Sequence, residues 1–510
     1  MKTFVIKAHA PLRSRYRGVA APMTGARRPD NHGLRPGRTK IPSRIALCAL
    51  ALLSGCAVGP SFHVPRSALP AHFTSVAHNA RPRWPSKTWW RGFHSPPLNH
   101  FIALAERHNF NIRIAAAELE AANAAVEVAG APLLPSVSAS GSAQWQRVAN
   151  PGATTTAGRT PSPFYGASVQ ASYLVDLWGE NRDALRAALA NAAAARFNRD
   201  TVALTEVTAV ATTWFQILAD RAALTIGLRN LRAAQRLLKQ LQTEFVAGTV
   251  DAVTVAQQAA LVASERANIP VLRSDLTQET QGLGILVGEP PEQLAIPPEH
   301  INALSVPRLI PGLPSRLLRR RPDVAQAEAN LIAANANVRA AIASFFPSIT
   351  LTGSANTSSA ALDTLLSPGS VLLNAATSIT QPLFEGGRLM GNLAVSRAVY
   401  REDVAAYEQT VVLAFTNTEQ SLTALHYATI EEHRQAQAVK EARRALAAVR
   451  AQLAAGIVDV SAVLTAEETL LGDENAYTDA QLTRLDAAIH LYQALGGGWR
   501  LRQPRHIVGS

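Results

Sequence analysis

The stretch FFPSITLTGS, Phe345 to Ser354, nearly repeats LLPSVSASGS, Leu133 to Ser142, at an offset of 212 residues. The same offset aligns Leu119, Ala121, Ala122, Asn123 and Ala124 with Leu331, Ala333, Ala334, Asn335 and Ala336. Later the offset is 208, which aligns Gly179, Gly248 and Asp251 with Gly387, Gly456 and Asp459. The chain therefore contains an internal repeat. The four-residue difference falls near Asn150 to Pro163, which we expect to form an exposed loop.

In each copy, a segment with the periodicity of a helix is followed by segments with the periodicity of strands. Ala-rich segments with helical spacing, Asn111 to Ala131 and Asp323 to Ser344, come first. Apolar and polar residues then alternate, as in Ala167 to Val175 and Leu373 to Ile379, so each copy offers two strands of roughly ten residues. Ile349 and Leu351 give the opening stretch one apolar face, opposite a face of Ser and Thr.

A long helical run follows the strands in each copy, from about Glu180 to Val246 and from about Arg388 to Ala454. Neither run contains proline, and at 1.5 Å per residue each makes a rod of about 100 Å. Each rod ends in a short turn, VAGTVD or AAGIVD. There Gly248 or Gly456 can supply a left-handed cap, and Asp251 or Asp459 can cap the returning helix.

The positive charge of the chain lies almost entirely in its first residues. Residues 1–55 carry eleven Lys and Arg against one acid, whereas the rest carries 38 basic and 36 acidic side chains. A nearly neutral body argues against a nucleic-acid partner. The basic leader runs into the apolar segment Ile45 to Leu53, a secretory signal pattern too short for a permanent membrane helix.

The segment Leu53-Ser54-Gly55-Cys56 resembles a bacterial lipobox, in which the cysteine becomes the acylated first residue of the mature protein. The other interpretation, an ordinary signal with an incidental cysteine, would leave a free thiol in an oxidising compartment. We predict lipidation of Cys56, because the motif stands directly after an apolar core. Several acyl chains would then hold the chain firmly to a membrane. Ala57 after the cysteine favours, by the same resemblance, the outer membrane.

Strands of this length and polarity are suited to a membrane barrel. Four strands are too few to close, and an open sheet cannot span lipid because its backbone groups would stay unpaired. The chain must therefore oligomerise, although dimers with eight strands and trimers with twelve both satisfy the argument.

Four stretches together resemble the TolC-like outer-membrane factors, in particular the lipoprotein branch of the NodT and OprM type. They are CAVGPSFHVP at Cys56 to Pro65, WWRGFHSPPLNHFIALAERHN at Trp89 to Asn109, the segment Leu317 to Gly353, and PLFEGGR at Pro382 to Arg388. The resemblance implies a mainly α-helical fold with a membrane β-barrel part: a homotrimer with one twelve-stranded barrel and long periplasmic helical hairpins.

The resemblance also implies a passive exit duct for drugs or other small toxic compounds. An inner-membrane pump, expected to be proton-driven, and a periplasmic adaptor would deliver the cargo. The hairpin turns would form the periplasmic aperture, with Gly248, Asp251, Gly456, Asp459 and Glu467 as candidates. Helix capping is an equally good role for the two aspartates. Thr465 stands where some relatives place an aperture carboxylate.

The repeat and the resemblance predict six segments: a leader and signal peptide (1–55), a lipidated tail and belt segment (56–110), the first repeat (111–288), a Pro-rich equatorial linker (289–321), the second repeat (322–496) and a C-terminal tail (497–510).

Other functions remain open on the sequence alone. A duct for protein secretion or metal-ion efflux would keep this fold, and a coiled-coil structural lipoprotein would need no pore. An enzyme is not favoured, because His94, His100 and His108 match no compact zinc motif and no nucleophile motif such as GxSxG is present. We therefore expect no cofactor, metal or catalytic residue.

Overall fold

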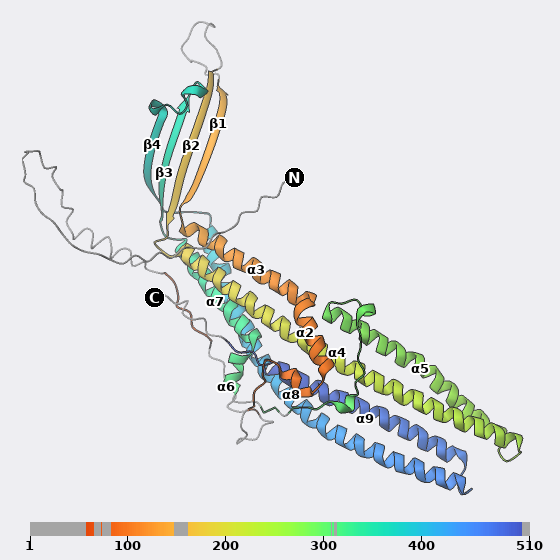
Figure 1. Cartoon of the computed structure of the whole chain (residues 1–510). Coiled ribbons are helices and arrows are strands. Elements are labelled where there is room, and N and C mark those ends of the chain that lie inside the picture. Colours follow the sequence, from red (N-terminus) through yellow and green to blue (C-terminus); the bar gives the residue numbers. More distant parts are fainter. Residues whose placement is uncertain are drawn as a thin grey trace, which may run out of the picture. The chain divides into compact units, whose positions relative to one another are not determined.

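The second half of the chain repeats the element order of the first: a helix, two strands, a long helix and a returning helix (Figure 1). The computed structural model describes residues 58–65, 73, 83–146, 162–307, 309–310 and 314–501. The predictions for the leader and for Cys56 therefore lie outside the described residues. All described residues belong to the unit Gly55–Ser510.

The strands form one antiparallel sheet in the order β1-β2-β3-β4. Their bounds are Ser136–Gln146, Ser162–Val175, Ser348–Ser359 and Val371–Thr380. The register aligns Ala139, Val169, Ala355 and Leu373 across the sheet, and likewise Val175, Ile349 and Ile379. Ser140 and Ser168 meet on the opposite face, with 2.7 Å between their hydroxyl oxygens. The predicted apolar and polar faces are therefore confirmed, and β1 and β4 are the two edges.

One boundary of the predicted first loop was wrong. The sequence placed Ser162 and Pro163 in the loop, but both belong to β2, where Pro163 is opposite Trp145. Proline is tolerated at the start of a strand, because a missing N–H costs least there. Residues 147–161 lie outside the described residues.

The two long helices have the predicted bounds, α4 at Glu180–Val246 and α8 at Arg388–Ala454, with 67 residues each. The returning helices are α5 (Ala252–Val287) and α9 (Val460–Ala494). We call α4 with α5 hairpin one, and α8 with α9 hairpin two. Two shorter helices, α3 (Phe110–Gly130) and α7 (Pro322–Ala343), pack against α4.

One face of α4 packs against other helices, because Val207, Ala211, Trp214 and Leu218, spaced by four, three and four residues, are buried. Within the described residues, α4 alone contains a stretch apolar enough to cross a membrane by composition, and half of that stretch is buried. Its apolar residues are thus explained by packing between helices.

The largest core lies where the segments outside the hairpins pack against α4. It contains residues of the turn η1 (Trp89–Phe93) and of α2 (Pro96–His108), including Trp89, Phe93, Leu98, Phe101 and Ile102. Glu299 from the linker accepts hydrogen bonds from Ser95 Oγ at 2.6 Å and Trp214 Nε1 at 3.0 Å. The remaining short elements are η2 (Ala131–Leu133), η3 (Pro291–Gln293), η4 (Ile301–Ala303), α6 (Pro314–Leu317), η5 (Leu318–Arg320), η6 (Leu362–Thr364) and η7 (Pro368–Ser370).

Candidate functional site

Both hairpin turns are closed by the same backbone geometry. Gly248 and Gly456 have φ of 78° and 67°, in the left-handed region that glycine adopts without strain. After each glycine, a backbone N–H returns to the preceding helix: Thr249 N to Glu244 O at 3.0 Å, and Ile457 N to Gln452 O at 2.9 Å. This pattern satisfies carbonyls at the end of a helix. The left-handed caps predicted at these glycines are thus confirmed.

Asp251 and Asp459 begin the returning helices as caps. Asp251 Oδ1 accepts a hydrogen bond from Thr254 N at 2.8 Å, and Asp459 Oδ1 accepts one from Ala462 N at 3.2 Å. The Thr254 N–H lowers the pKa of Asp251, and the Ser461 hydroxyl followed by the Ala462 N–H lowers the pKa of Asp459. Each tip thus carries a solvent-exposed carboxylate that is charged at neutral pH.

Glu467 lies two turns above the tip of hairpin two, on α9. Its Oε1 is 2.7 Å from Arg450 Nη2 on α8, so the pair joins the two helices of one hairpin. Thr465, where some relatives place a carboxylate, instead donates its hydroxyl to Ser461 O at 3.0 Å. Whether Glu467 contributes to an aperture remains a prediction.

A buried carboxylate that the sequence analysis missed connects the two hairpins. Glu474 on α9 has a side chain only 5% exposed, and it pairs with Arg229 of α4 and Arg443 of α8. Arg443 donates to Glu474 Oε1 from Nη2 at 2.9 Å and from Nε at 3.3 Å. Both arginines are half exposed, and burial followed by the nearby Arg443 lowers the pKa of Arg229. One carboxylate therefore holds cations from both hairpins.

The sequence did contain a signal for this carboxylate. The buried positions of α9 follow alternating spacings of four and three: Glu474, Thr478, Gln481, Leu485 and Ala488. A glutamate on such a stripe must find a cation or a hydrogen-bond donor, because burying an unpaired charge is very costly. Spacing could not identify the partners, since Arg229 is 245 residues away.

A cavity of 290 Å³ extends from this ion-pair cluster toward the tips. Its lining includes Arg229, Arg443 and Glu474 at one end and Arg450 and Glu467 at the other. The two ion-paired groups therefore lie along one gap between the hairpins.

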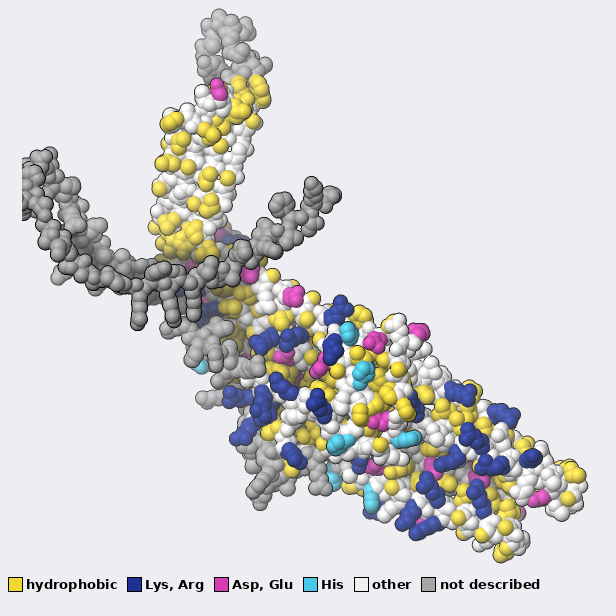
Figure 2. Space-filling view, in the orientation of Figure 1, with side chains coloured by type: hydrophobic (Ala, Val, Ile, Leu, Met, Phe, Trp, Pro, Cys, Tyr) yellow, Lys and Arg dark blue, Asp and Glu magenta, His cyan; other side chains and the backbone are white. Residues whose placement is uncertain are grey.

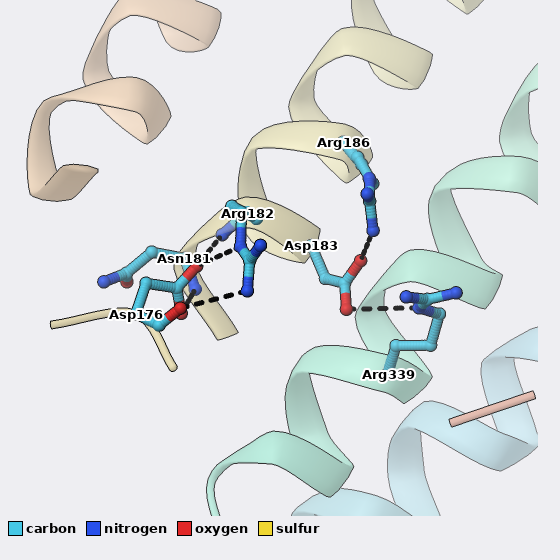
Figure 3. Close-up of polar contacts among 6 residues, drawn as sticks. All are labelled: Asp176, Asn181, Arg182, Asp183, Arg186 and Arg339. Atoms are coloured by element: carbon cyan, nitrogen blue, oxygen red, sulfur yellow. Dashed lines mark hydrogen bonds and ion pairs between the residues drawn. The ribbon is translucent and has the colours of Figure 1, made fainter. Parts of the chain in front are cut away.

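The junction between sheet and helices has a polar cluster of its own (Figure 3). Asp176, just after β2, accepts the backbone N–H groups of Asn181 at 3.1 Å and Arg182 at 2.9 Å, which caps α4. Asp183 is fully buried and pairs with Arg186 at 2.6 Å and with Arg339 of α7 at 3.1 Å. These contacts fix the first turns of α4 to α7 directly below the sheet.

Charged side chains avoid the sheet. None of the four described strands contains Asp, Glu, Lys or Arg. Figure 2 shows the contrast: the strands are coloured yellow and white, whereas Lys and Arg gather on the helices. A Lys or Arg on a lipid-facing barrel position costs about 2–4 kcal/mol at the bilayer midplane, so this composition suits a membrane environment.

The three histidines considered as candidates for an enzyme site are His94, His100 and His108. His94 ends η1, and its Nδ1 lies 2.6 Å from Ser305 Oγ. His100 is near the Phe101 ring. Among the described residues, no group of three or more His, Cys, Asp and Glu could hold a metal ion.

Known proteins share both the sequence and this architecture. The sequence profile described as outer membrane efflux protein matches residues 101–289 and 313–497. The pyoverdine export outer membrane protein OpmQ of Pseudomonas aeruginosa is 33% identical over 459 residues, covering 89% of this chain and 96% of that protein. The toluene efflux pump outer membrane protein TtgC of Pseudomonas putida is 31% identical over 458 residues, covering 88% and 94%.

A solved structure agrees. The open state of the MtrE outer membrane channel of Neisseria gonorrhoeae has a TM-score of 0.78 and 28% identity, covering 87% of this chain and 99% of that one.

An uncharged, two-faced sheet joined to long helical hairpins thus defines a TolC-like outer-membrane channel, as the sequence predicted. The chain belongs to the outer membrane efflux protein family and is an outer-membrane efflux channel.

Proposed function

We propose that three copies of the chain form one twelve-stranded barrel that acts as the passive exit duct of a tripartite pump. The open four-stranded sheet carries this proposal. Strands β1 and β4 are unpaired on their outer sides, and every residue of β4 is exposed in the single chain. Unpaired backbone groups cannot face lipid, so β4 of one copy pairs with β1 of the next until the ring closes.

The partners follow from the hairpins. Rods of about 100 Å extend far beyond a hydrocarbon core of about 30 Å, so the tips at Gly248 and Gly456 reach into the periplasm. A periplasmic adaptor meets these tips and connects them to an inner-membrane pump. The pump, which we propose to be proton-driven, supplies the energy.

The proposed cargo is small organic molecules, drugs and other toxic compounds among them. Two relatives support this class, because one is a pyoverdine export protein and another a toluene efflux protein. A wide duct discriminates only weakly between substrates, so the pump determines which molecules are exported.

The tips form the aperture in this proposal. In a trimer, Asp251 and Asp459 contribute six carboxylates around the threefold axis, and such rings select ions and narrow a pore. Glu467 lies further from the tips and braces hairpin two through Arg450. The predicted division into two repeats, 111–288 and 322–496, assigns one hairpin and two strands to each repeat.

We also propose that Cys56 is acylated and anchors the chain in the outer membrane. Gly59, three residues later, lies against Arg339 of α7, close to the sheet junction. Three residues of any conformation span at most about 10 Å, so this length of chain would let an acylated Cys56 reach a bilayer around the sheet. The variant Cys56→Ser should lose incorporation of radiolabelled fatty acid, and continued labelling would refute the assignment.

Reconstitution tests the channel itself. The protein purified in detergent should have the mass of three chains and should conduct ions in a planar bilayer. A single-chain mass together with no conductance would instead support a structural lipoprotein without a pore. Loss of efflux of a small organic dye after gene deletion, restored by the intact gene, would support the cargo class. Unchanged dye efflux with loss of a secreted protein would contradict it.

A further inference from the structure

The most exposed apolar side chains of the described residues follow directly after β4. Leu383 is 93% exposed and Phe384 is 89% exposed. The loop that carries them is held in place, because Gln381 Nε2 donates to Phe345 O at 3.0 Å and Glu385 pairs with Arg388. A fixed loop that presents two large apolar side chains, with no apolar partner among the described residues, points to a partner outside the chain.

The topology identifies what lies beside this loop. β4 ends, and β1 begins, at the end of the sheet nearest the helices (Figure 1). When β4 pairs antiparallel with β1 of the next copy, residues just after β4 come beside residues just before β1. Leu383 lies three residues after the end of β4, and Leu134 lies two residues before the start of β1.

The segment before β1 offers a matching surface. Leu134 is 69% exposed and Val128, near the end of α3, is 74% exposed. An exposed apolar stripe continues down α3 at helical spacing: Phe110, Ile114, Ala117, Ala121, Ala125 and Val128. Only Ala115 of α3 is fully buried. We call these six residues the α3 outer stripe, and all six are exposed among the described residues.

Helix α8 continues the same edge below the loop. Its bounds begin at Arg388, and its first buried residue is Tyr407. Met390 and Val395 are exposed in between. The helix attached to each edge strand thus presents an uncovered apolar surface, and closing the ring brings the two together.

We propose that Leu383 and Phe384 of one copy pack onto Val128 and Leu134 of the next copy, and that this contact continues between the start of α8 and the α3 outer stripe. The proposal rests on the oligomeric barrel proposed above and identifies its contact surface outside the membrane. Lipid is the competing partner for Leu383 and Phe384. The neighbouring Glu385 and Arg388 argue against it, because charged groups avoid the hydrocarbon.

Cysteine cross-linking tests the contact. The double variant Leu134→Cys with Phe384→Cys should form covalent dimers and trimers on oxidation. A bond within one chain is excluded, because the residues flank opposite edges of a four-stranded sheet, about 14 Å apart. The matched control joins Leu134→Cys with Leu366→Cys, which is 81% exposed in the β3–β4 connection at the far end of the sheet. The control should stay monomeric on a denaturing gel.

A second set of measurements tests whether the partner of Phe384 is protein or lipid. Phe384→Ser should speed subunit exchange between trimers about ten- to hundredfold, as expected for losing one buried aromatic contact, whereas Leu366→Ser should not. Phe384→Trp should be shielded from brominated lipid. Intact trimers with no cross-link and strong quenching by brominated lipid would overturn this contact and leave the proposed function standing. A single-chain mass with no conductance would overturn the proposed function itself.

Discussion

Arg229 of α4 and Glu474 of α9 form an ion pair between hairpin one and hairpin two. Arg443 of α8 shares the same carboxylate, so Glu474 is the common acceptor of both hairpins. The pair lies on the tip side of the main core. The two hairpins can therefore separate only if this carboxylate loses one of its partners.

The variant Glu474→Ala should loosen the hairpins at the tips. It leaves two arginines without their acceptor, but both are half exposed and can turn to water, so we expect a loss of about 1–3 kcal/mol in the free energy of unfolding. Single-channel conductance should rise. The matched control is Glu441→Ala, whose pair with Arg444 is exposed on both sides and contributes less than about 1 kcal/mol. Equal conductance in both variants would contradict this role.

The sequence predicted the elements better than it predicted the contacts between them. The bounds of α4 and α8 could be found because glycine precedes each helix, proline is absent within it and a glycine turn follows it. Strand faces followed from alternation alone, and the register confirms them. The spacing on α9 could have flagged Glu474 but not its partners, since the three helices meet only after both hairpins have packed side by side.

The cap at Asp251 should make the tip sensitive to acid. Its pKa is lowered in the folded chain, so the carboxylate contributes its full stabilisation above the ordinary value of 3.8 and loses it as pH falls through the lower folded value. The protection of the first turn of α5 against hydrogen exchange, measured relative to the intrinsic exchange rate at each pH, should therefore fall at low pH. Asp251→Asn keeps an acceptor for the Thr254 N–H and should remove the pH dependence of this protection. In Asp251→Ala the first turn of α5 should fray at every pH. Identical behaviour of the two variants would contradict the cap.

The two arginines at Asp183 should differ sharply in their effect. Asp183 is fully buried, Arg339 is 17% exposed and Arg186 is 55% exposed. Arg339→Ala should therefore lower stability by about 3 kcal/mol, because it removes the inner partner of a buried charge. Arg186→Ala should cost less than about 1 kcal/mol. Thermal unfolding in detergent would compare them, and a larger loss in Arg186→Ala would mean that the outer pair holds the junction.

Asp486 of α9 should contribute stability that declines as pH rises toward neutrality. Burial raises the pKa of Asp486 to about 7, and its Oδ1 is buried without a hydrogen-bond partner among the described residues. The folded chain then holds this proton more tightly than the unfolded chain, whose pKa is near 3.8. Its contribution is therefore greatest below pH 4, declines between about pH 4 and 7, and is constant above that range.

The variant Asp486→Asn should be more stable than the parent at pH 8, by about 4 kcal/mol, and nearly equal to it at pH 4. Unfolding at the two pH values measures this difference, with Asp363→Asn in the exposed β3–β4 connection as a control that should show neither effect. The free energy of unfolding of the parent and of Asp486→Asn could instead change by the same amount between pH 4 and 7. That result would mean that Asp486 is charged over the whole range.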